Sequence, residues 1–327
     1  MYKFEIDKIV EIIKRNNYRV VSLQFPDGLR DYSTSVAEKI DEKIPALITL
    51  ISSNPCYGAC DLVDEDAMNL GAEALFHFGH AQLLKKSRIP VYYIEVRLPH
   101  SFIDILEKNL DKLPENLGLV TTVQHIHRVK EVKDYLETHG FNVHTGRPEG
   151  RCKYEAQVLG CSFSAAKSIA SEVDAFLYMG SGDFHPLGVA LATGKPCFAL
   201  DPLLKEIRSL EEKKEKFLKQ RYATIAKAKN AESFGIIVGE KRGQRRLSLA
   251  MGIRRKLMAM NRKSFLIHAR EITPENIIYF RKLDALVNTA CPRIVIEDSP
   301  RFYNPLLTPK ELEIVMGERD SYEMDEF

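Results

Sequence analysis

The feature that most constrains the fold is a threefold recurrence of strand-like segments, spaced at intervals of about 100 residues. In one set, an acid follows a proline by five residues across an apolar strand: IPVYYIE (89–95), KPCFALD (195–201) and CPRIVIE (291–297). A matching apolar segment precedes each of these: EALFHFGHA (73–81), DAFLYMGSG (174–182) and DALVNTACP (284–292). Another set lies earlier still: YRVVSLQFPDG (18–28), LGLVTTVQHIH (117–127) and SFGIIVGEKRG (233–243). The common order of the three sets predicts three repeats of one design.

Helical patterns lie between the strand-like segments. One is RVKEVKDYLETHG (128–140), which ends on the glycine that helix C-termini favour. Strands that alternate with helices indicate parallel sheets covered on both faces, hence an α/β fold. We expect three similar α/β domains, at 1–97, 98–203 and 204–327. The last is expected to begin with a long charged helix, within LLKEIRSLEEKKEKFLKQRYATIAKAKN.

Composition excludes several classes of protein. The 327 residues are 45% hydrophobic and 28% charged, with a formal net charge of +2, so no strong field favours nucleic acid or a membrane surface. No run approaches the roughly 18–20 apolar residues of a membrane span. The first residues, MYKFEIDKIVEIIKRNN, form an amphipathic helix pattern rather than a signal peptide. These features favour a cytoplasmic protein.

The six cysteines are the clearest chemical signal. Reducing cytosol disfavours structural disulfides, so metal binding, redox chemistry and simple burial stay open. Each predicted domain carries at least one cysteine after a strand, at the sheet edge where α/β sites are built. Three thiolates that converge from three domains suit a 4Fe-4S cluster with one iron left open to a substrate. An open zinc site and three independently buried cysteines are the alternatives.

Local context selects one cysteine in each domain. Cys60 follows Gly58 and Ala59, which permit close approach, and precedes a helical stretch, whereas Cys56 falls in the preceding turn. Cys161 opens an apparent helix, whereas Cys152 lies in a polar loop, and Cys197 falls inside a strand. The predicted metal ligands of the three domains are Cys60, Cys161 and Cys291.

Other polar and glycine residues follow predicted strands and are candidates for ligand contacts. Asp27 and Gly28 follow the first strand, where a plain turn is the alternative. The remaining candidates are His80, Gly180, Gly182 and His185. His77 and His80 match no standard metal spacing, so a second metal is not expected. The acids Glu95, Asp201 and Glu297 either line the centre or are solvated. The basic runs KEKFLKQR and GEKRGQRR either dock a macromolecule or form an exposed face.

Six motifs together resemble the archaeal diphthamide-synthesis enzyme. In order along the chain they are QFPDGL (24–29), NPCYGACD (54–61), FGHA (78–81), VLGCSF (158–163), GSGDFHPLG (180–188) and NTACPRI (288–294). The resemblance spans nearly the whole chain, although the region 204–232 and the tail SYEMDEF contribute little to it.

This resemblance implies a non-standard radical S-adenosylmethionine enzyme without the usual C-x₃-C-x₂-C run. The family's cluster cysteines carry over onto Cys60, Cys161 and Cys291. The implied reaction transfers a 3-amino-3-carboxypropyl group from S-adenosylmethionine to a histidine carbon of elongation factor 2, the first step of diphthamide biosynthesis. Its cofactor is a 4Fe-4S cluster and its reductant a one-electron donor. The family also implies a homodimer.

Two other functions fit the cysteine pattern. A quinolinate-synthase-like dehydratase also builds three domains around three cysteines, and its open iron acts as a Lewis acid. A non-catalytic scaffold with buried cysteines that binds a translation factor is the other. Iron content and S-adenosylmethionine binding distinguish the three.

Overall fold

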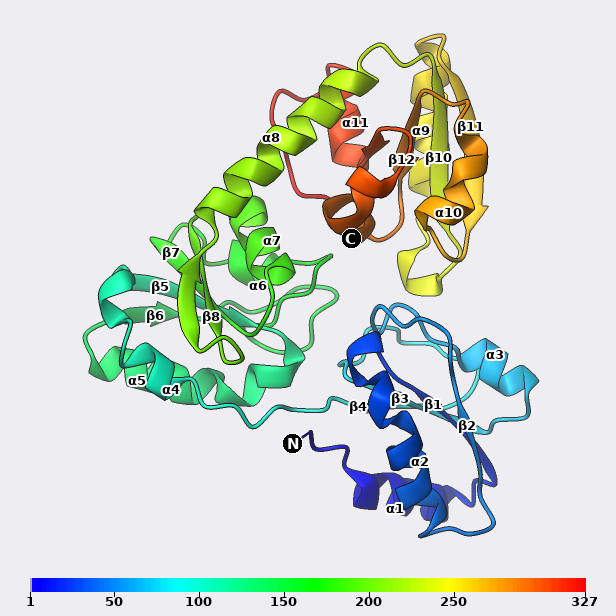
Figure 1. The fold of residues 1–327 in the computed structure, drawn as a ribbon, viewed down its shortest axis with the longest axis vertical. Coiled ribbons are helices and arrows are strands. Elements are labelled where there is room, and N and C mark those ends of the chain that lie inside the picture. Colours follow the sequence, from blue (N-terminus) through cyan, green and yellow to red (C-terminus); the bar gives the residue numbers. More distant parts are fainter. Residues whose placement is uncertain (1) are drawn as a thin grey trace.

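The computed structural model describes residues 2–327 and contains three separate β-sheets with helices around them (Figure 1). The strand orders are β2-β1-β3-β4, β6-β5-β7-β8-β9 and β11-β10-β12-β13. In each sheet, the strand in the second place comes first along the chain. The strand in the first place comes next, and the strands in the third and fourth places follow in that order. The three α/β units predicted from the sequence repeat are therefore confirmed.

The element bounds follow the chain. The strands are β1 Val20–Gln24, β2 Ile48–Ile51, β3 Ala74–Phe78, β4 Val91–Ile94, β5 Asn116–Thr121, β6 Asn142–His144, β7 Ala175–Met179, β8 Cys197–Asp201, β9 Glu206–Ser209, β10 Ser233–Gly239, β11 Lys263–Ala269, β12 Ala285–Asn288 and β13 Leu306–Leu307. The α-helices are α1 Ile6–Asn16, α2 Ser33–Asp41, α3 Asp64–Asn69, α4 Ile103–Leu106, α5 Val129–Thr138, α6 Ser164–Lys167, α7 Phe184–Thr193, α8 Glu211–Ala228, α9 Leu247–Ala259, α10 Pro274–Ile277 and α11 Pro309–Val315.

The second sheet ends on an antiparallel strand. All pairings in the first and third sheets are parallel, but β9 folds back on β8 and places Ser209 opposite Phe198. The prediction that a long helix leads into the third domain was therefore wrong about where that helix begins. Ile207 is buried while its neighbour Glu206 is exposed, which is a strand pattern, and α8 begins only at Glu211. The division at 1–97, 98–203 and 204–327 stays a prediction, but the second sheet reaches beyond it to Ser209.

The segment CPRIVIE in the third unit is not a strand. Residues Ile294–Asp298 form a π-helix, and β13 supplies the strand that pairs with β12. A short apolar run does not by itself distinguish strand from helix, which is why the repeat misled. Glu297 consequently pairs with Arg293 one helical turn away, at 2.5 Å, and does not end a strand.

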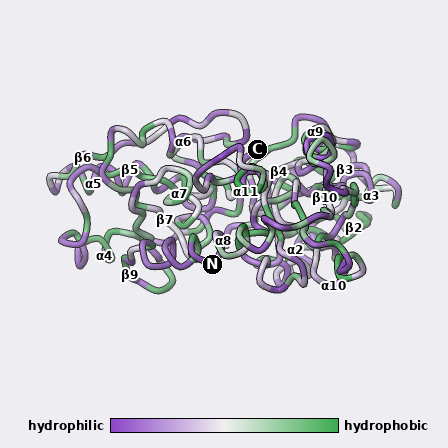
Figure 2. Tube along the Cα trace, turned by 90° about the horizontal axis from the view of Figure 1, so that it is seen from above, coloured by the Kyte–Doolittle hydropathy of each residue, from purple (hydrophilic) through white to green (hydrophobic). Residues whose placement is uncertain are grey.

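Each unit has its own apolar core. The first core includes Phe25 and Phe78, whose rings stack with centroids 4.2 Å apart. The second and third sheets each bury apolar residues in two separate clusters. Hydrophobic and hydrophilic residues are interspersed along all three units in Figure 2. Among residues 2–327, no helix combines the length and hydrophobicity needed to cross a membrane.

The helix α8 connects the second unit to the third (Figure 1). Its Arg221 is 2% exposed and forms a bidentate pair with Glu311 of α11, at 2.6 and 2.7 Å. Arg221 also donates to the carbonyl of Leu306 and the hydroxyl of Ser299, so every direction of the guanidinium fork is used. This part of the run KEKFLKQR is therefore internal, not a docking surface.

Candidate functional site

The three cysteines predicted as ligands come one from each unit, and each lies in a loop after a parallel strand, although the loop of Cys291 follows a later strand of its unit than the loops of Cys60 and Cys161 do. Cys60 follows β2, Cys161 lies between β6 and α6, and Cys291 follows β12. Burial is the main cause that raises the pKa of Cys291 to about 12, and the thiols of Cys60 and Cys161 both add to it. Burial likewise raises the pKa of Cys60, and Cys161 raises it further. All three pairs of thiols are thus close enough to act on one another's charge.

Of the other three cysteines, Cys56 and Cys152 are each coupled to one predicted ligand, because Cys60 raises the pKa of Cys56 and Cys161 raises that of Cys152, whereas Cys197 is coupled to none of the three. Cys197 is fully buried inside β8, as expected for a core residue. Cys56 is 4% exposed, and its thiol donates to the carbonyl of Gly58 at 3.8 Å. Cys152 lies near Cys161, although burial is the main cause that raises its pKa to about 12. The distinction between ligands and bystanders stays a prediction.

Polar groups of the second and third units donate hydrogen bonds to the sulfur or backbone atoms of two of the cysteines. The Arg151 guanidinium donates to Sγ of Cys161 at 3.5 Å and to the carbonyl of Gly243 at 2.6 Å. The amide N–H of Gly243 donates to the carbonyl of Cys60 at 3.1 Å, and Nε2 of Gln244 donates to Sγ of Cys60 at 3.4 Å. Two of the three sulfur atoms therefore already accept N–H hydrogen bonds.

Position 243 has room only for glycine. A Cβ built there would lie 2.5 Å from both Cα and Cβ of Cys60, which is far inside ordinary contact. The glycine therefore lets the third unit approach the backbone of a predicted ligand in the first. Sequence reasoning placed this residue in a basic run and missed its role.

The C-terminal tail forms another wall of the site. The backbone N–H of Phe327 donates to the carbonyl of Cys161 at 3.0 Å. The Phe327 ring lies 4.0 Å from the guanidinium of Arg151 and 4.1 Å from that of Arg246. Arg246 also pairs with Asp325, at 2.5 Å, and donates to the carbonyl of Ala290 beside Cys291. Nothing in the letters SYEMDEF indicated that this tail reaches the cysteines.

A buried ion group joins the first and third units beside Cys60. Lys241, which is 5% exposed, lies 2.8 Å from Asp61 and 2.9 Å from Glu271, and its ammonium lies over the ring of Tyr57. The neighbouring Arg242 pairs with the fully buried Asp64. The run GEKRGQRR is thus largely an internal connection between units, and only part of it faces solvent.

The predicted ligand contacts at the strand ends fall into two groups. Asp27 and Gly28 begin a 3₁₀-helix after β1, where Asp27 pairs with Arg30 at 2.5 Å. Gly180 and Gly182 follow β7, and both have a positive φ, at 148° and 78°. Their roles in ligand binding stay predictions.

His185 lies in the first turn of α7 in the second unit, and His80 lies in the loop after β3 in the first unit. His185 stacks on Tyr178, with centroids 5.9 Å apart and planes 10° from parallel. Burial lowers the pKa of His185 to about 4, and positive charge on Arg293 and on His80 lowers it further. Arg293, two residues after Cys291, also lowers the pKa of that thiol.

Two of the strand-end acids have structural partners. Glu95 accepts from the hydroxyl of Tyr154 at 2.6 Å and pairs with Arg97, which links the first and second units. Asp201 is 1% exposed, pairs with Arg208 and accepts from the backbone of the β8–β9 turn. Both carboxylates therefore fix loops in place.

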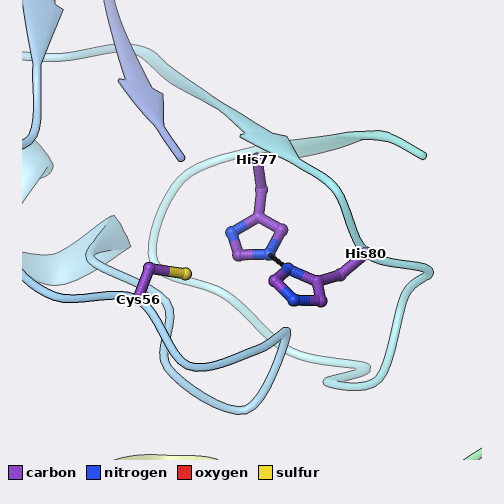
Figure 3. Close-up of side chains that lie close together, drawn as sticks. All are labelled: Cys56, His77 and His80. Atoms are coloured by element: carbon purple, nitrogen blue, oxygen red, sulfur yellow. Dashed lines mark hydrogen bonds between the residues drawn. The ribbon is translucent and has the colours of Figure 1, made fainter. Parts of the chain in front are cut away.

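One further cluster contains three potential metal-binding atoms. The ligating atoms of Cys56, His77 and His80 all lie within 4.8 Å of one another (Figure 3). The two imidazoles are hydrogen-bonded to each other, with 2.9 Å between Nε2 of His77 and Nδ1 of His80. The sequence spacing had not suggested this set.

Comparison with known proteins places these features in one family. Residues 25–326 match the family model described as a putative diphthamide synthesis protein. A 2-(3-amino-3-carboxypropyl)histidine synthase from Pyrococcus horikoshii is 36% identical, over 100% of this chain and 94% of that protein. Subunit 1 of the same synthase from Eremothecium gossypii is 30% identical over 97% of this chain and 75% of that protein.

Solved structures agree with the sequence match. The crystal structure of Dph2 from Pyrococcus horikoshii with a 4Fe-4S cluster superposes with a TM-score of 0.92, at 36% identity, covering 100% of this chain and 94% of that one. A second crystal structure of the same protein gives a TM-score of 0.93. With its three repeated sheets, its cysteine arrangement and matches over its full length, this chain belongs to the diphthamide-synthesis family of 2-(3-amino-3-carboxypropyl)histidine synthases.

Proposed function

We propose that this chain is a 2-(3-amino-3-carboxypropyl)histidine synthase that modifies a histidine of elongation factor 2 with S-adenosylmethionine as donor. The observation that carries this is the link between cysteines of different units, in which Arg151 donates to Sγ of Cys161 and to the carbonyl of Gly243, whose N–H donates to the carbonyl of Cys60. The family match supports it over a quinolinate-synthase-like dehydratase or a scaffold.

The donor set fits a 4Fe-4S cluster with three protein ligands. Three thiols, N–H groups that donate to two of the sulfurs, and a glycine that lets backbones approach closely are features such clusters use. Cys60, Cys161 and Cys291 would hold the cluster. When bound and reduced, it supplies one electron to the sulfonium of S-adenosylmethionine and so cleaves a carbon–sulfur bond.

Residues of this chain orient the cysteine side chains and cover one side of the site. Gln244 and Arg151 keep two cysteine side chains in place through their N–H groups. Phe327 and the guanidinium groups of Arg151 and Arg246 that flank its ring cover one side of Cys161. We propose that S-adenosylmethionine binds on the open side, near the carboxyl ends of the strands that lead into Asp27, Gly28, His80, Gly180, Gly182 and His185.

The assembly belongs to the same proposal. Homodimer formation and a one-electron donor rest on the family resemblance. Sedimentation of the chain at micromolar concentration should give twice the 37.3 kDa of one chain.

The function is tested by anaerobic reconstitution with iron and sulfide, followed by reductant, labelled S-adenosylmethionine and archaeal elongation factor 2. We expect label on the factor and one 5′-methylthioadenosine per label. Accumulation of 5′-deoxyadenosine instead, or a protein that binds no iron, would contradict the proposal.

A further inference from the structure

The segment 322–327 has an irregular backbone, yet α8 and the second unit hold it along its length (Figure 1). The backbone N–H of Tyr322 donates to the hydroxyl of Tyr222 on α8 at 3.0 Å, and its ring packs edge-on against Phe217 with centroids 5.8 Å apart. Met324 is 2% exposed and packs into the apolar core of the second unit. The segment therefore leaves the third unit, to which α11 belongs, and is fixed on the second.

Residues 326 and 327 hold the loop of Cys161 at two points. The backbone N–H of Phe327 donates to the carbonyl of Cys161 at 3.0 Å. The carboxylate of Glu326 accepts from the N–H of Phe163 at 2.8 Å and from Nζ of Lys167 at 2.9 Å. Two hydrogen bonds from this segment therefore fix the backbone that directly follows the Cα atom of the cysteine.

Asp325 reaches the loop of Cys291 through one arginine. The residue is 2% exposed, and its carboxylate accepts from both terminal nitrogens of Arg246, at 3.0 and 2.5 Å. The same guanidinium donates to the carbonyl of Thr289 at 2.7 Å and to that of Ala290 at 3.2 Å, which are the two residues before Cys291. The bidentate pair thus fixes a guanidinium whose other N–H groups hold the backbone that leads into the cysteine.

The ring of Phe327 contacts both sides of this arrangement. Its centroid lies 4.0 Å from the guanidinium of Arg151 and 4.1 Å from that of Arg246. Arg151 donates to Sγ of Cys161, and Arg246 donates to the carbonyls before Cys291. One aromatic ring therefore stabilises, through cation–π contacts, two arginines that serve different predicted ligands.

We propose that residues 325–327 form a positioning strap, which holds the loops of Cys161 and Cys291 in the relative positions that the cluster requires. This inference rests on the proposed function and assigns positioning residues to it. Cysteines that ligate one cluster must present their sulfur atoms to it together, although they come from different units. A segment that contacts the loops of two units restricts both before any iron binds, which lowers the entropic cost of binding.

The burial of the strap distinguishes it from a cover that leaves in every turnover. Moving the segment away would expose Met324, which now lies in the core of the second unit. It would also leave the Arg246 guanidinium without the buried carboxylate of Asp325. We therefore expect the strap to stay in place throughout the reaction.

The test compares Asp325→Asn and Phe327→Ala with two control variants of the same tail. Asparagine keeps the shape of aspartate and removes its charge, whereas alanine removes the aromatic ring. The first control, Phe327→Tyr, keeps a ring between the two arginines. The second is Glu323→Gln, which changes a carboxylate that pairs with Lys310 and Arg319 of the third unit.

Amide hydrogen exchange is measured on the metal-free full-length chain, so this readout needs neither iron nor turnover. We expect Asp325→Asn to exchange about tenfold faster or more at 288–293, and Phe327→Ala to do so at both 159–164 and 288–293. The strands of the three sheets should exchange within about twofold of wild type in both variants. Both controls should exchange as wild type does.

The second readout is the rate at which an iron chelator removes iron from each anaerobically reconstituted protein. Loss of a group that orients a metal ligand typically costs about 10–100-fold in metal affinity. We expect Asp325→Asn and Phe327→Ala to lose iron about tenfold faster or more than wild type, and the EPR spectrum of their reduced clusters to change. Phe327→Tyr and Glu323→Gln should match wild type in both measurements.

Three results would overturn the assignment. The first is iron release from Asp325→Asn and Phe327→Ala within about threefold of wild type. The second is faster exchange that extends through the strands of the second and third sheets, which would show a general loss of stability. The third is iron release from Glu323→Gln as fast as from Asp325→Asn. Wild type that binds no iron would instead refute the proposed function, and exchange in the metal-free chain would still decide whether 325–327 holds the two loops.

Discussion

Replacing Gly243 by alanine tests whether close approach of the third unit to Cys60 is required. The added methyl carbon would lie 2.5 Å from Cα and Cβ of Cys60 and 2.7 Å from its carbonyl oxygen. Ordinary contacts begin at 3.4 Å, so one backbone must move by about 1 Å. Neither can yield as the end of a flexible side chain would.

The expected cost has two parts. Overpacking of a well-packed site costs about 1–3 kcal/mol. The shift also strains the hydrogen bonds from Gly243 to Cys60, at 3.1 Å, and from Arg151 to Gly243, at 2.6 Å, which contribute about 1 kcal/mol or more each. We expect the free energy of unfolding of the metal-free protein to fall by about 2–4 kcal/mol.

The matched control is Gly252→Ala on α9. No atom lies within 4 Å of the methyl carbon there, so alanine should stabilise the helix by about 0.5–1 kcal/mol. Urea unfolding of both metal-free variants and iron per chain after reconstitution are the measurements. Gly243→Ala should bind less than half the iron of wild type. Unchanged stability together with full iron in this variant would refute the reasoning.

Three further predictions concern the cysteines, a buried ion pair and pH. Alanine at any of the three predicted ligands should abolish iron binding and transfer, whereas iron analysis should find wild-type iron in the variants of Cys56, Cys152 and Cys197. Arg221→Met leaves the buried carboxylate of Glu311 without its partner and should cost about 3–5 kcal/mol in urea unfolding, while removal of an exposed lysine charge on α8 should change less than about 0.5 kcal/mol. Burial and nearby positive charge lower the pKa of His125 to about 4, below the value of about 6.5 in an unfolded chain. The unfolded state therefore binds more protons between these values, so stability present above pH 6.5 falls on acidification, by about 1.4 kcal/mol per unit for such a histidine. His125→Phe should show a smaller slope in unfolding experiments from pH 7 to pH 5, and an equal slope would contradict this.

The repeat made the three sheets predictable, because parallel strands buried on both faces leave near-continuous apolar runs such as 74–78 and 175–179. It failed at 294–298, where a run of similar composition forms a π-helix. The strand at 206–209 was missed because its charged residues look like the beginning of the charged helix α8 that follows it. Patterns of apolar residues along the chain predict which residues are buried, but they do not predict which other element buries them.

The same limit applies to the site. Positions of cysteines after strands could be read from the letters, since topology brings strand ends together. The residues that surround the cysteines could not be predicted in this way. Gln244 contacts Cys60 across 184 positions, and Phe327 reaches Cys161 from the end of the sequence. Hydrogen bonds over such separations follow from docking of the units, which no local motif encodes.

The placement of one cysteine in each unit also makes any group bonded to all three a cross-link within the chain. About 100 residues separate Cys60 from Cys161, and about 130 separate Cys161 from Cys291. In chain-entropy terms, closing a loop of about 100 residues can restrict the unfolded state by about 4.7 kcal/mol. Because each unit keeps its own core, a metal-free chain can open one unit at a time. Iron supply would then decide whether the molecule responds to heat or proteases as three bodies or as one.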